Sequence, residues 1–229
     1  MTPTAATRRL RFAALAALLC GALVVGADRL AAGLAEHAIA DRIAGARPGL
    51  AARPDVTVEG FPFLPQAATG TFDQVRVEAR RAGGAAGPAV SADVRLRQVR
   101  RHGGGYTAAQ PDARFRVTLA DLAEQLAPGS ELTELGPDRL RLSRDLLGRP
   151  LTVDLTLTLQ GRTVVAHPTT AAYDGRPVDP RQRPQLSQFL GRDLTRTLPD
   201  LPIGLTATAL RTDAGALTLD ARTDHPTLG

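Results

Sequence analysis

From residue 55 onward, apolar and polar residues alternate along the chain with a period of two. The longest example is LTVDLTLTLQ (151–160), in which every odd-numbered position is apolar and every even-numbered one is polar. Because successive side chains of a strand point to opposite faces, this pattern predicts strands with one buried and one solvated face. One solvated face per strand favours antiparallel pairing. Shorter runs of the same kind occupy 56–58, 72–79, 90–96, 115–119, 140–142, 164–166, 205–209 and 217–221.

Three other segments repeat apolar residues at helical spacing. The first, 28–43, begins with Asp28 as its expected N-cap, and it either opens the domain or continues the segment before it. The second, TLADLAEQLAP (118–128), has a capping box formed by Thr118 and Asp121. The third is PQLSQFLGRDLTRTLP (184–199). Their narrow aliphatic stripes fit the buried face of a sheet, so we expect an α+β fold in which a long curved antiparallel sheet wraps one or two helices.

The first 27 residues are typical of an export signal or an N-terminal membrane anchor. Arg8, Arg9 and Arg11 precede the apolar run 12–27, which ends in the small residues Gly26 and Ala27. This run is shorter than the roughly 20 residues of a transmembrane helix. We expect an exported protein of the cell envelope, secreted, periplasmic or associated with the membrane through its N-terminal segment. Residues 28–229 would form a single domain.

Charge and composition argue against nucleic acid as a partner. The net charge of +5 owes much to three arginines ahead of Asp28, and from that residue onward 25 arginines face 23 acidic residues. The two signs are interleaved, which is typical of a solvated surface rather than of a basic patch. The chain has no Trp and is only 3% aromatic, so it lacks platforms for base stacking.

The sequence contains no pattern that predicts catalysis, a metal site or a cofactor. Its four histidines are not spaced as zinc ligands, no G-x-S-x-G motif occurs, and a phosphate-binding loop with lysine is excluded because the chain has no lysine. Cys20, the only cysteine, lies in the apolar N-terminal run. We expect a non-enzymatic protein stabilised by a core of Leu, Val and Ala. Such a core either closes fully or leaves an elongated apolar cavity for an alkyl chain.

The stretch EGFPFLPQ (59–66) is the most unusual local sequence. Phe61 and Phe63 flank Pro62, and Pro62 and Pro65 disfavour both a helix and a regular central strand. In an extended backbone the two rings point to opposite sides. Two interpretations stay open: the rings fill the end of an aromatic-poor core, or they form a stiff apolar lip at the mouth of a groove.

Residues 56–79, VTVEGFPFLPQAATGTFDQVRVEA, resemble the signature of a family of secreted or anchored actinobacterial envelope proteins long known as a domain of unknown function. That signature is a valine-rich strand, G-F-P-F-L-x-Q, a linker with Gly, and a V-x-V strand. Pro65 stands where the family usually has Thr. The resemblance continues at Asp121-Leu122 and across 198–222, so it spans most of the exported chain.

The resemblance implies a tubular lipid-binding architecture of the bactericidal/permeability-increasing type. The family includes a mycobacterial protein of lipomannan elongation and maintenance that associates with phosphoinositides. The implied function is binding of phospholipid or glycolipid acyl chains in an elongated apolar groove, in support of envelope lipid or lipoglycan maintenance. The alternative is an anchored scaffold for enzymes of envelope glycolipid synthesis.

The residues expected to contact lipid come from the motif 59–66, from predicted strands and from helix faces; they are Phe61, Phe63, Leu64, Phe72, Phe115, Leu122, Leu126 and Phe189. Arginines on the polar register of the strands either contact a lipid phosphate or are simply solvated; these are Arg76, Arg95, Arg97 and Arg116.

Overall fold

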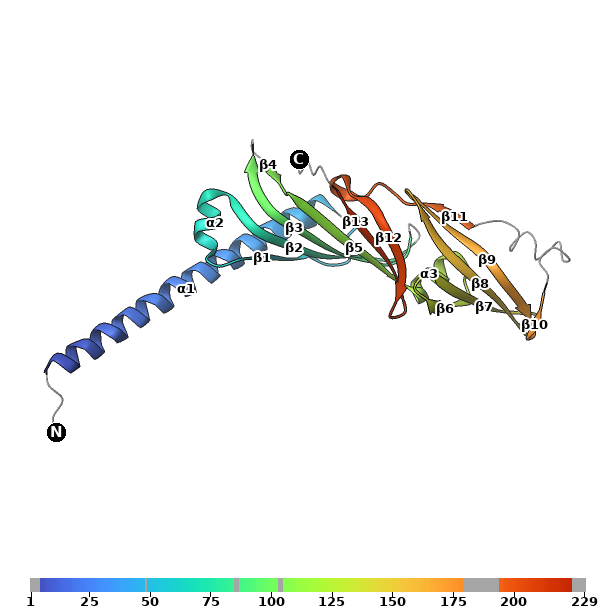
Figure 1. Cartoon of the computed structure of the whole chain (residues 1–229), viewed down its shortest axis with the longest axis horizontal. Coiled ribbons are helices and arrows are strands. Elements are labelled where there is room, and N and C mark those ends of the chain that lie inside the picture. The colour runs from blue at the N-terminus through green and yellow to red at the C-terminus, as the bar shows by residue number, and fades with distance from the viewer. Residues whose placement is uncertain (1–4, 48, 85–86, 103–104, 179–193, 224–229) are drawn as a thin grey trace.

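The protein consists of two antiparallel sheets that follow one another along the longest axis, with a long helix projecting from one end (Figure 1). The computed structural model describes residues 5–47, 49–84, 87–102, 105–178 and 194–223. The expected α+β class with antiparallel strands is confirmed, but the strands form two sheets instead of the single long sheet that we expected. Period-two alternation reveals a strand's faces and not its partners, so this division could not be read from it.

The first sheet has the order β1-β2-β3-β5-β13-β12, with β4 beside β3. Its strands are β1 (Asp55–Glu59), β2 (Thr71–Arg81), β3 (Val90–His102), β4 (Gly105–Thr107), β5 (Gln110–Thr118), β12 (Thr206–Asp213) and β13 (Ala216–Arg222). The second sheet has the order β10-β9-β8-β7-β6, with β11 beside β9. Its strands are β6 (Ser130–Gly136), β7 (Arg139–Leu146), β8 (Arg149–Gln160), β9 (Thr163–Tyr173), β10 (Arg176–Pro177) and β11 (Leu194–Thr197).

Backbone hydrogen bonds fix the second sheet against strand β12 of the first. The N–H of Thr212 donates to the carbonyl oxygen of Pro137, 2.6 Å away, and the Thr212 hydroxyl donates to the carbonyl of Gly136. The N–H of Leu119 likewise donates to Gly215 at 2.9 Å. These bonds join the turn between β6 and β7, and the start of α3, to the β12–β13 hairpin.

Helix α3 (Leu119–Leu126) forms where the sequence predicts it. The Thr118 hydroxyl accepts a hydrogen bond from the N–H of Asp121 at 3.1 Å, as a helix N-cap does. Leu119 and Ala123 are buried against β6 and β7. The third predicted helix, 184–199, is wrong at its end, because Leu194–Thr197 is strand β11, paired with β9. Residues 184–193 of that segment, including Phe189, lie outside the described residues.

Helix α1 runs without interruption from Ala5 to Ala46. The helix expected from Asp28 therefore continues the N-terminal segment, and Asp28 is not its N-cap. Ala32, Ala40 and their neighbours pack on the apolar face of β1, β2 and β3. The Glu36 carboxylate accepts a hydrogen bond from the N–H of Val58 at 2.8 Å. A side chain of α1 thus binds the backbone of the edge strand β1.

Helix α2 (Phe63–Thr69) corrects the expectation that EGFPFLPQ is not helical. Pro65 occupies the first turn, where a backbone N–H has no partner within the helix, so proline is tolerated there. The N-cap is Pro62, which offers no capping side chain, and the Phe61–Pro62 peptide bond is cis. Gly70, with φ at +67°, ends the helix in the left-handed conformation that glycine favours.

The missing cap of α2 comes from α1. One oxygen of the Asp28 carboxylate accepts a hydrogen bond from the N–H of Phe63 at 2.9 Å, and the other accepts one from the N–H of Leu64 at 2.8 Å. Only 2% of Asp28 is exposed to solvent. Burial alone would raise the pKa of this carboxyl group, but the two N–H donors and the charge of Arg29 outweigh it and lower the pKa. A charged Asp28 thus fixes α2 to α1.

Candidate functional site

One face of the first sheet carries apolar side chains in register across its strands. Val77 lies opposite Val94, Val94 opposite Ala113, and Ala113 opposite Ala221. The neighbouring row pairs Ala92 with Phe115. Since neighbouring strands lie about 4.8 Å apart, the six strands from β1 to β12 make this face roughly 24 Å wide.

Three groups of side chains cover parts of this apolar face. Helix α1 covers the β1–β3 end. The segment around the short turn Pro202–Gly204 covers the middle, where Leu205 packs on Ala113 and Ala221. Helix α3 covers the junction with the second sheet, where Leu217 of β13 joins its cluster. The apolar face therefore continues from one sheet into the next.

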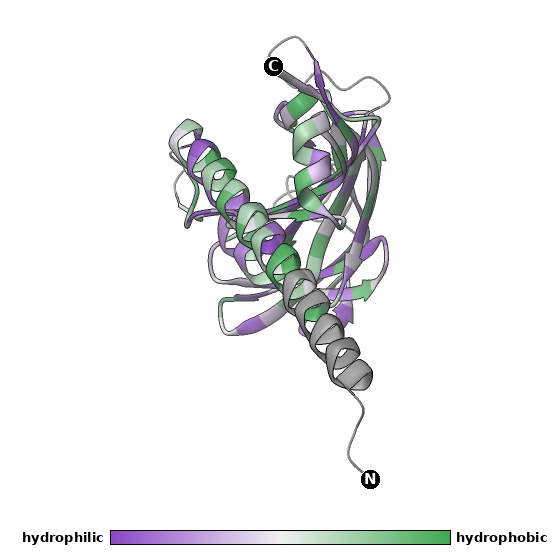
Figure 2. Cartoon of the chain, turned by 90° about the vertical axis from the view of Figure 1, so that its left-hand side faces the viewer, coloured by the Kyte–Doolittle hydropathy of each residue, from purple (hydrophilic) through white to green (hydrophobic). Residues whose placement is uncertain are grey.

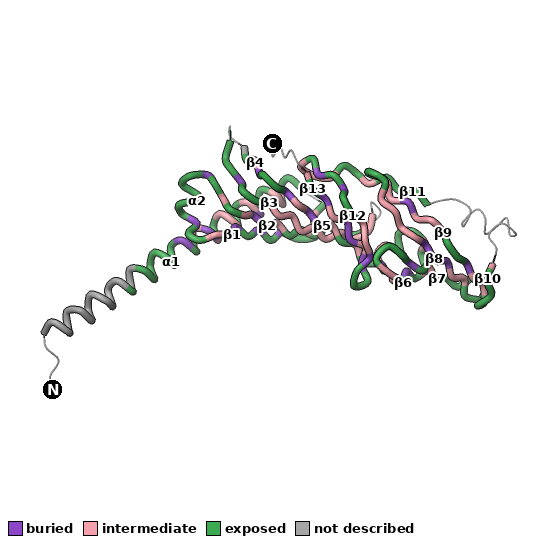
Figure 3. The backbone as a smooth tube through the Cα atoms, viewed as in Figure 1, coloured by how far each residue is buried: buried purple, intermediate pink, exposed green. Residues whose placement is uncertain are grey.

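Beside these covers, β3 and β5 keep apolar side chains that are only half-buried, and two of them, Val94 and Phe115, pack against the Leu205 cluster. We call this set the apolar strip; it consists of Val90, Ala92, Val94, Phe115 and Val117. Residues 87–96 are half-buried throughout, and half-buried stretches lie along strands of both sheets (Figure 3). Within the expected lipid-contacting set, Phe115 is the residue that lies in the apolar strip.

Phe63 and Phe72 lie together at the α2 end of the core. Phe63 is only 5% exposed, and its ring stacks on that of Phe72 with 6.0 Å between centroids. Tyr106 of β4 follows at 6.4 Å from Phe72. Phe63 and Phe72 fill the space between α2 and the first sheet, so the interpretation of an aromatic plug fits Phe63 and not Phe61, which is 59% exposed.

The other expected lipid-contacting residues are dispersed. Phe61 and Leu64 are exposed beside α1, and the Arg29 guanidinium lies 5.0 Å from the centroid of the Phe61 ring. Leu122 packs on the α3 cluster, and Leu126, on the same helix, is exposed. Sequence reasoning missed the role of Asp28, although a carboxylate at the end of an apolar run was a visible signal. It also missed Tyr106.

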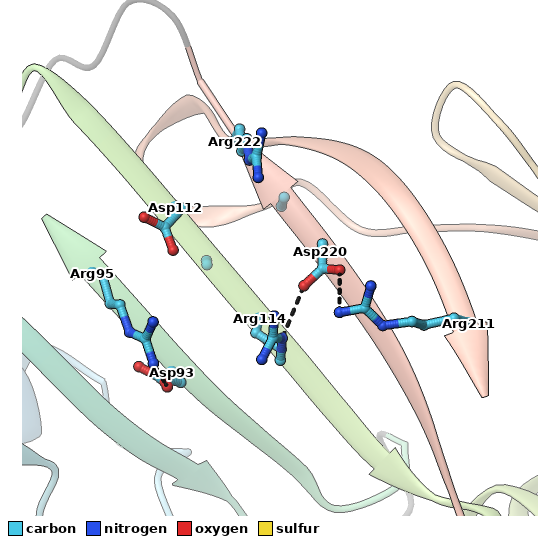
Figure 4. A pocket seen from close by; sticks show the side chains of 9 residues that line it. Asp93, Arg95, Asp112, Arg114, Arg211, Asp220 and Arg222 are labelled. Atoms are coloured by element: carbon cyan, nitrogen blue, oxygen red, sulfur yellow. Dashed lines mark hydrogen bonds and ion pairs between the residues drawn. The ribbon is translucent and has the colours of Figure 1, made fainter. Parts of the chain in front are cut away.

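The opposite face of the first sheet is a network of ion pairs (Figure 4). Asp220 of β13 accepts a hydrogen bond from Arg114 at 2.9 Å and forms an ion pair with Arg211 at 2.8 Å. Asp93 of β3 is held by both Arg76, in a two-pronged contact of 2.7 and 3.0 Å, and Arg95. These ion pairs line a hollow whose lining residues are mostly charged. A second hollow, between Glu59 and Gln110, is lined mainly by polar residues. Neither hollow is the expected apolar cavity.

The arginines considered for a lipid phosphate belong to this network. Arg76 and Arg95 pair with Asp93, Arg97 lies 3.8 Å from Asp112, and Arg116 lies 3.7 Å from Asp213. Side chains of this face point away from the apolar strip, because the two sets alternate along the same strands. These arginines therefore stabilise the polar surface and are not neighbours of a chain lying on the strip.

The second sheet contains a comparable contact in a drier place. Asp154 of β8 is 9% exposed and accepts two hydrogen bonds from Arg141, at 2.7 and 3.0 Å, and one from the Thr170 hydroxyl at 2.9 Å. The hydrogen bonds from Arg141 are the largest influence on the pKa of Asp154 and lower it, against the opposing effect of burial. The pKa of Asp93 is lowered in the same way by Arg76.

These carboxylates are expected to make the protein sensitive to acid. Their pKa values are lower in the folded state than the ordinary value of 3.8, so the unfolded chain binds protons more readily. The stabilisation is complete above that value and is lost as the pH falls below it. Thermal unfolding followed by circular dichroism should show a melting temperature that falls steeply below about pH 4.

Asp154→Asn should make that pH dependence shallower, because it removes one titrating group. Asp138→Asn is the matched control, since Asp138 is exposed in the turn between β6 and β7. A melting temperature that stays constant down to acidic pH, or the same change of slope in both variants, would contradict the role given to Asp154.

Among the described residues, no group of three or more His, Cys, Asp or Glu side chains is arranged to hold a metal ion. Over the same part of the chain, no helix is both long enough and apolar enough to cross a membrane.

Comparison with known proteins gives one match. A family model described as LmeA-like phospholipid-binding matches residues 26–222. The matched region begins in α1, two residues before Asp28, and ends with β13, so it contains both sheets, α2 and α3. Neither the curated proteins nor the solved structures gave a match.

Proposed function

The chain belongs to the LmeA-like phospholipid-binding family, and from this premise we propose that it holds the acyl chains of a membrane phospholipid against the apolar strip. The observation that carries the proposal is the set of half-buried apolar side chains on β3 and β5, placed between the covers formed by α1 and α3. Among the described residues, Val90, Ala92 and Val117 of this set belong to none of the buried clusters, and they offer the surface that an alkyl chain would cover.

The energy of such binding comes from apolar contact. Each methylene group moved from water to an apolar surface contributes about 0.8 kcal/mol, so an acyl chain of ordinary length supplies most of the affinity. Because the apolar face continues across the strands of the first sheet and into the cluster under α3, it accommodates an extended chain. The side chains of the strip have no hydrogen-bonding groups that an acyl chain would have to satisfy. The strip therefore suits lipids that differ in acyl composition.

Arg81 is the residue that we assign to the lipid phosphate. It follows Val77 and Ala79 at the two-residue spacing of β2 and pairs with Val90, so it lies on the apolar face at the end of the strip. It is exposed, and within the described residues it forms no ion pair. A guanidinium donates two parallel hydrogen bonds to a phosphate, which suits the headgroups of phosphatidylinositol and related lipids.

The proposed setting is the cell envelope, reached by export. Arg8, Arg9 and Arg11 ahead of the apolar run 12–27 support it, as does the resemblance at residues 56–79 to exported envelope proteins. In this setting the protein supports maintenance of envelope lipids or lipoglycans by binding lipid, without catalysing a reaction. The family description likewise names binding and no reaction.

Native mass spectrometry of protein purified without detergent tests the proposal, together with titration of a fluorescent phosphatidylinositol. We expect a bound phospholipid in the wild-type chain. Ala92→Glu should weaken binding by about tenfold or more, because an unpaired carboxylate facing an acyl chain costs at least about 1.4 kcal/mol. Arg81→Gln should weaken binding of phosphatidylinositol and leave binding of diacylglycerol unchanged.

Ser91→Glu is the matched control. Ser91 precedes Ala92 in β3, is half-buried to a similar degree, and lies on the opposite face beside Arg116. Its replacement should leave lipid binding unchanged. Absence of bound lipid together with no uptake of the probe would reject the proposed function, and equal losses in the two glutamate variants would reject the apolar strip as the site.

A further inference from the structure

The place where α1 leaves the domain has an unusual surface. From Gly21 to Ala27 every residue of α1 is exposed, although the segment consists of Gly, Ala, Leu and Val. A helix that is apolar on all sides is normally buried, either in a protein or in a membrane. The surroundings of this segment therefore decide what covers it.

Four exposed residues lie at this place, and we call them the collar: Arg29 and Leu30 of α1, and Phe61 and Leu64 beside it. Phe61 and Leu64 come from α2 and its approach, on the side of α1 that faces the domain. Leu30 lies on the outer side of α1, where Leu34 is also exposed. Figure 2 views the molecule from this end, with α1 extending from the sheets.

The collar is held rigidly. Asp28 accepts hydrogen bonds from the N–H groups of Phe63 and Leu64, which fixes α2 to α1. Gly60, with φ at +114°, lets the chain turn into Phe61, and a Cβ at Gly60 would come within 2.5 Å of the Gln66 amide nitrogen. Arg29 contacts the Gly60 carbonyl at 3.4 Å and lies over the Phe61 ring. An exposed aromatic ring is thus kept in one position with a cation above it.

We propose that the collar rests on the surface of a phospholipid bilayer. Phe61, Leu30 and Leu64 enter the boundary between headgroups and acyl chains, Arg29 contacts lipid phosphates, and the exposed apolar segment 21–27 extends into the lipid. The partner is a bilayer and not a protein groove because the apolar residues surround the helix instead of forming one stripe. Amphipathic side chains with an apolar body and a cationic end suit that boundary.

This inference rests on the proposed function only for the choice of phospholipid as the partner. It adds an orientation: the apolar strip stands away from the bilayer along the domain, while the motif 59–66 contacts it.

Single-tryptophan variants of the full chain test the docking, because the wild-type chain has no Trp. Phe61→Trp and Leu64→Trp should each show a blue shift of emission when vesicles of phosphatidylcholine and phosphatidylglycerol are added. Brominated lipids should quench both. Leu147→Trp is the control, since Leu147 is 92% exposed in the β7–β8 turn of the second sheet, at a distance from α1 (Figure 1).

The double variant Phe61→Ser and Leu64→Ser should lower the partition coefficient onto these vesicles roughly tenfold. Arg29→Gln should reduce the preference for phosphatidylglycerol over pure phosphatidylcholine. Unchanged emission of Phe61→Trp on addition of vesicles would overturn the proposal that the collar rests on a bilayer. Equal emission shifts in Phe61→Trp and Leu147→Trp would overturn it as well. If probe lipid still binds the strip under these conditions, the proposed function survives that failure.

Discussion

Phe63→Ala is expected to lower the free energy of unfolding by about 3–5 kcal/mol, whereas Phe61→Ala should change it by less than about 0.5 kcal/mol. The two rings are separated by one proline, yet their environments differ completely. Phe63 is buried against Val58, Val75 and the ring of Phe72, and its removal leaves a cavity that α2 cannot close. Phe61 is 59% exposed and loses mainly its contact with Arg29.

Urea denaturation of both variants, followed by circular dichroism, measures the difference directly. The same variants should separate in vesicle binding, with Phe61→Ala weakened and still folded. Equal stability of the two variants would contradict the assignment of Phe63 as the aromatic plug. Equal destabilisation would mean that Phe61 is also part of the core.

Leu140→Ala has the second largest expected effect, a loss of about 2–5 kcal/mol. Leu140 is 2% exposed and belongs to a cluster that unites α3, the second sheet and Leu217 of the first sheet. A cavity at this point weakens the contact between the sheets as well as the packing of α3. Leu147→Ala is the control, because it makes the same substitution at an exposed leucine. It should change the free energy of unfolding by less than about 0.5 kcal/mol.

Amide hydrogen exchange shows how far this damage spreads. Because hydrogen bonds from Thr212 also join β12 to the turn between β6 and β7, we expect faster exchange in β12 and β13 as well as in β6 and β7. Faster exchange confined to the second sheet would show that the two sheets unfold independently and that the α3 cluster does not couple them.

Much of the strand structure could be predicted because alternation is a local property. The run at 151–160 lies within β8, and the shorter runs lie within other strands, except that 115–119 and 205–209 each extend one residue beyond β5 and β12. The three short strands β4, β10 and β11 span too few residues to show a period. β6 was missed because its apolar residues, Leu132 and Leu135, are three apart and do not alternate.

The candidate site was less predictable because it depends on contacts between distant segments. Proline at position 65 was interpreted as excluding a helix, but the cap that starts α2 comes from Asp28, 35 residues away from Phe63. The sequence does indicate that Phe61 and Phe63 differ in direction. Which of them is buried follows only from the position of α1, and the exposure of the strip depends on where α1 and α3 end.

Strand β1 terminates the first sheet, and the exposed edge of a terminal strand is where another chain can add by hydrogen bonding. Many proteins block such an edge with lysine, which this chain lacks. Here the Glu36 carboxylate accepts a hydrogen bond from the N–H of Val58. Arg53, just before β1, donates a hydrogen bond to the His37 carbonyl at 2.7 Å. Helix α1 therefore also protects this edge, and conditions that lift it from the sheet would expose β1 to pairing with another chain.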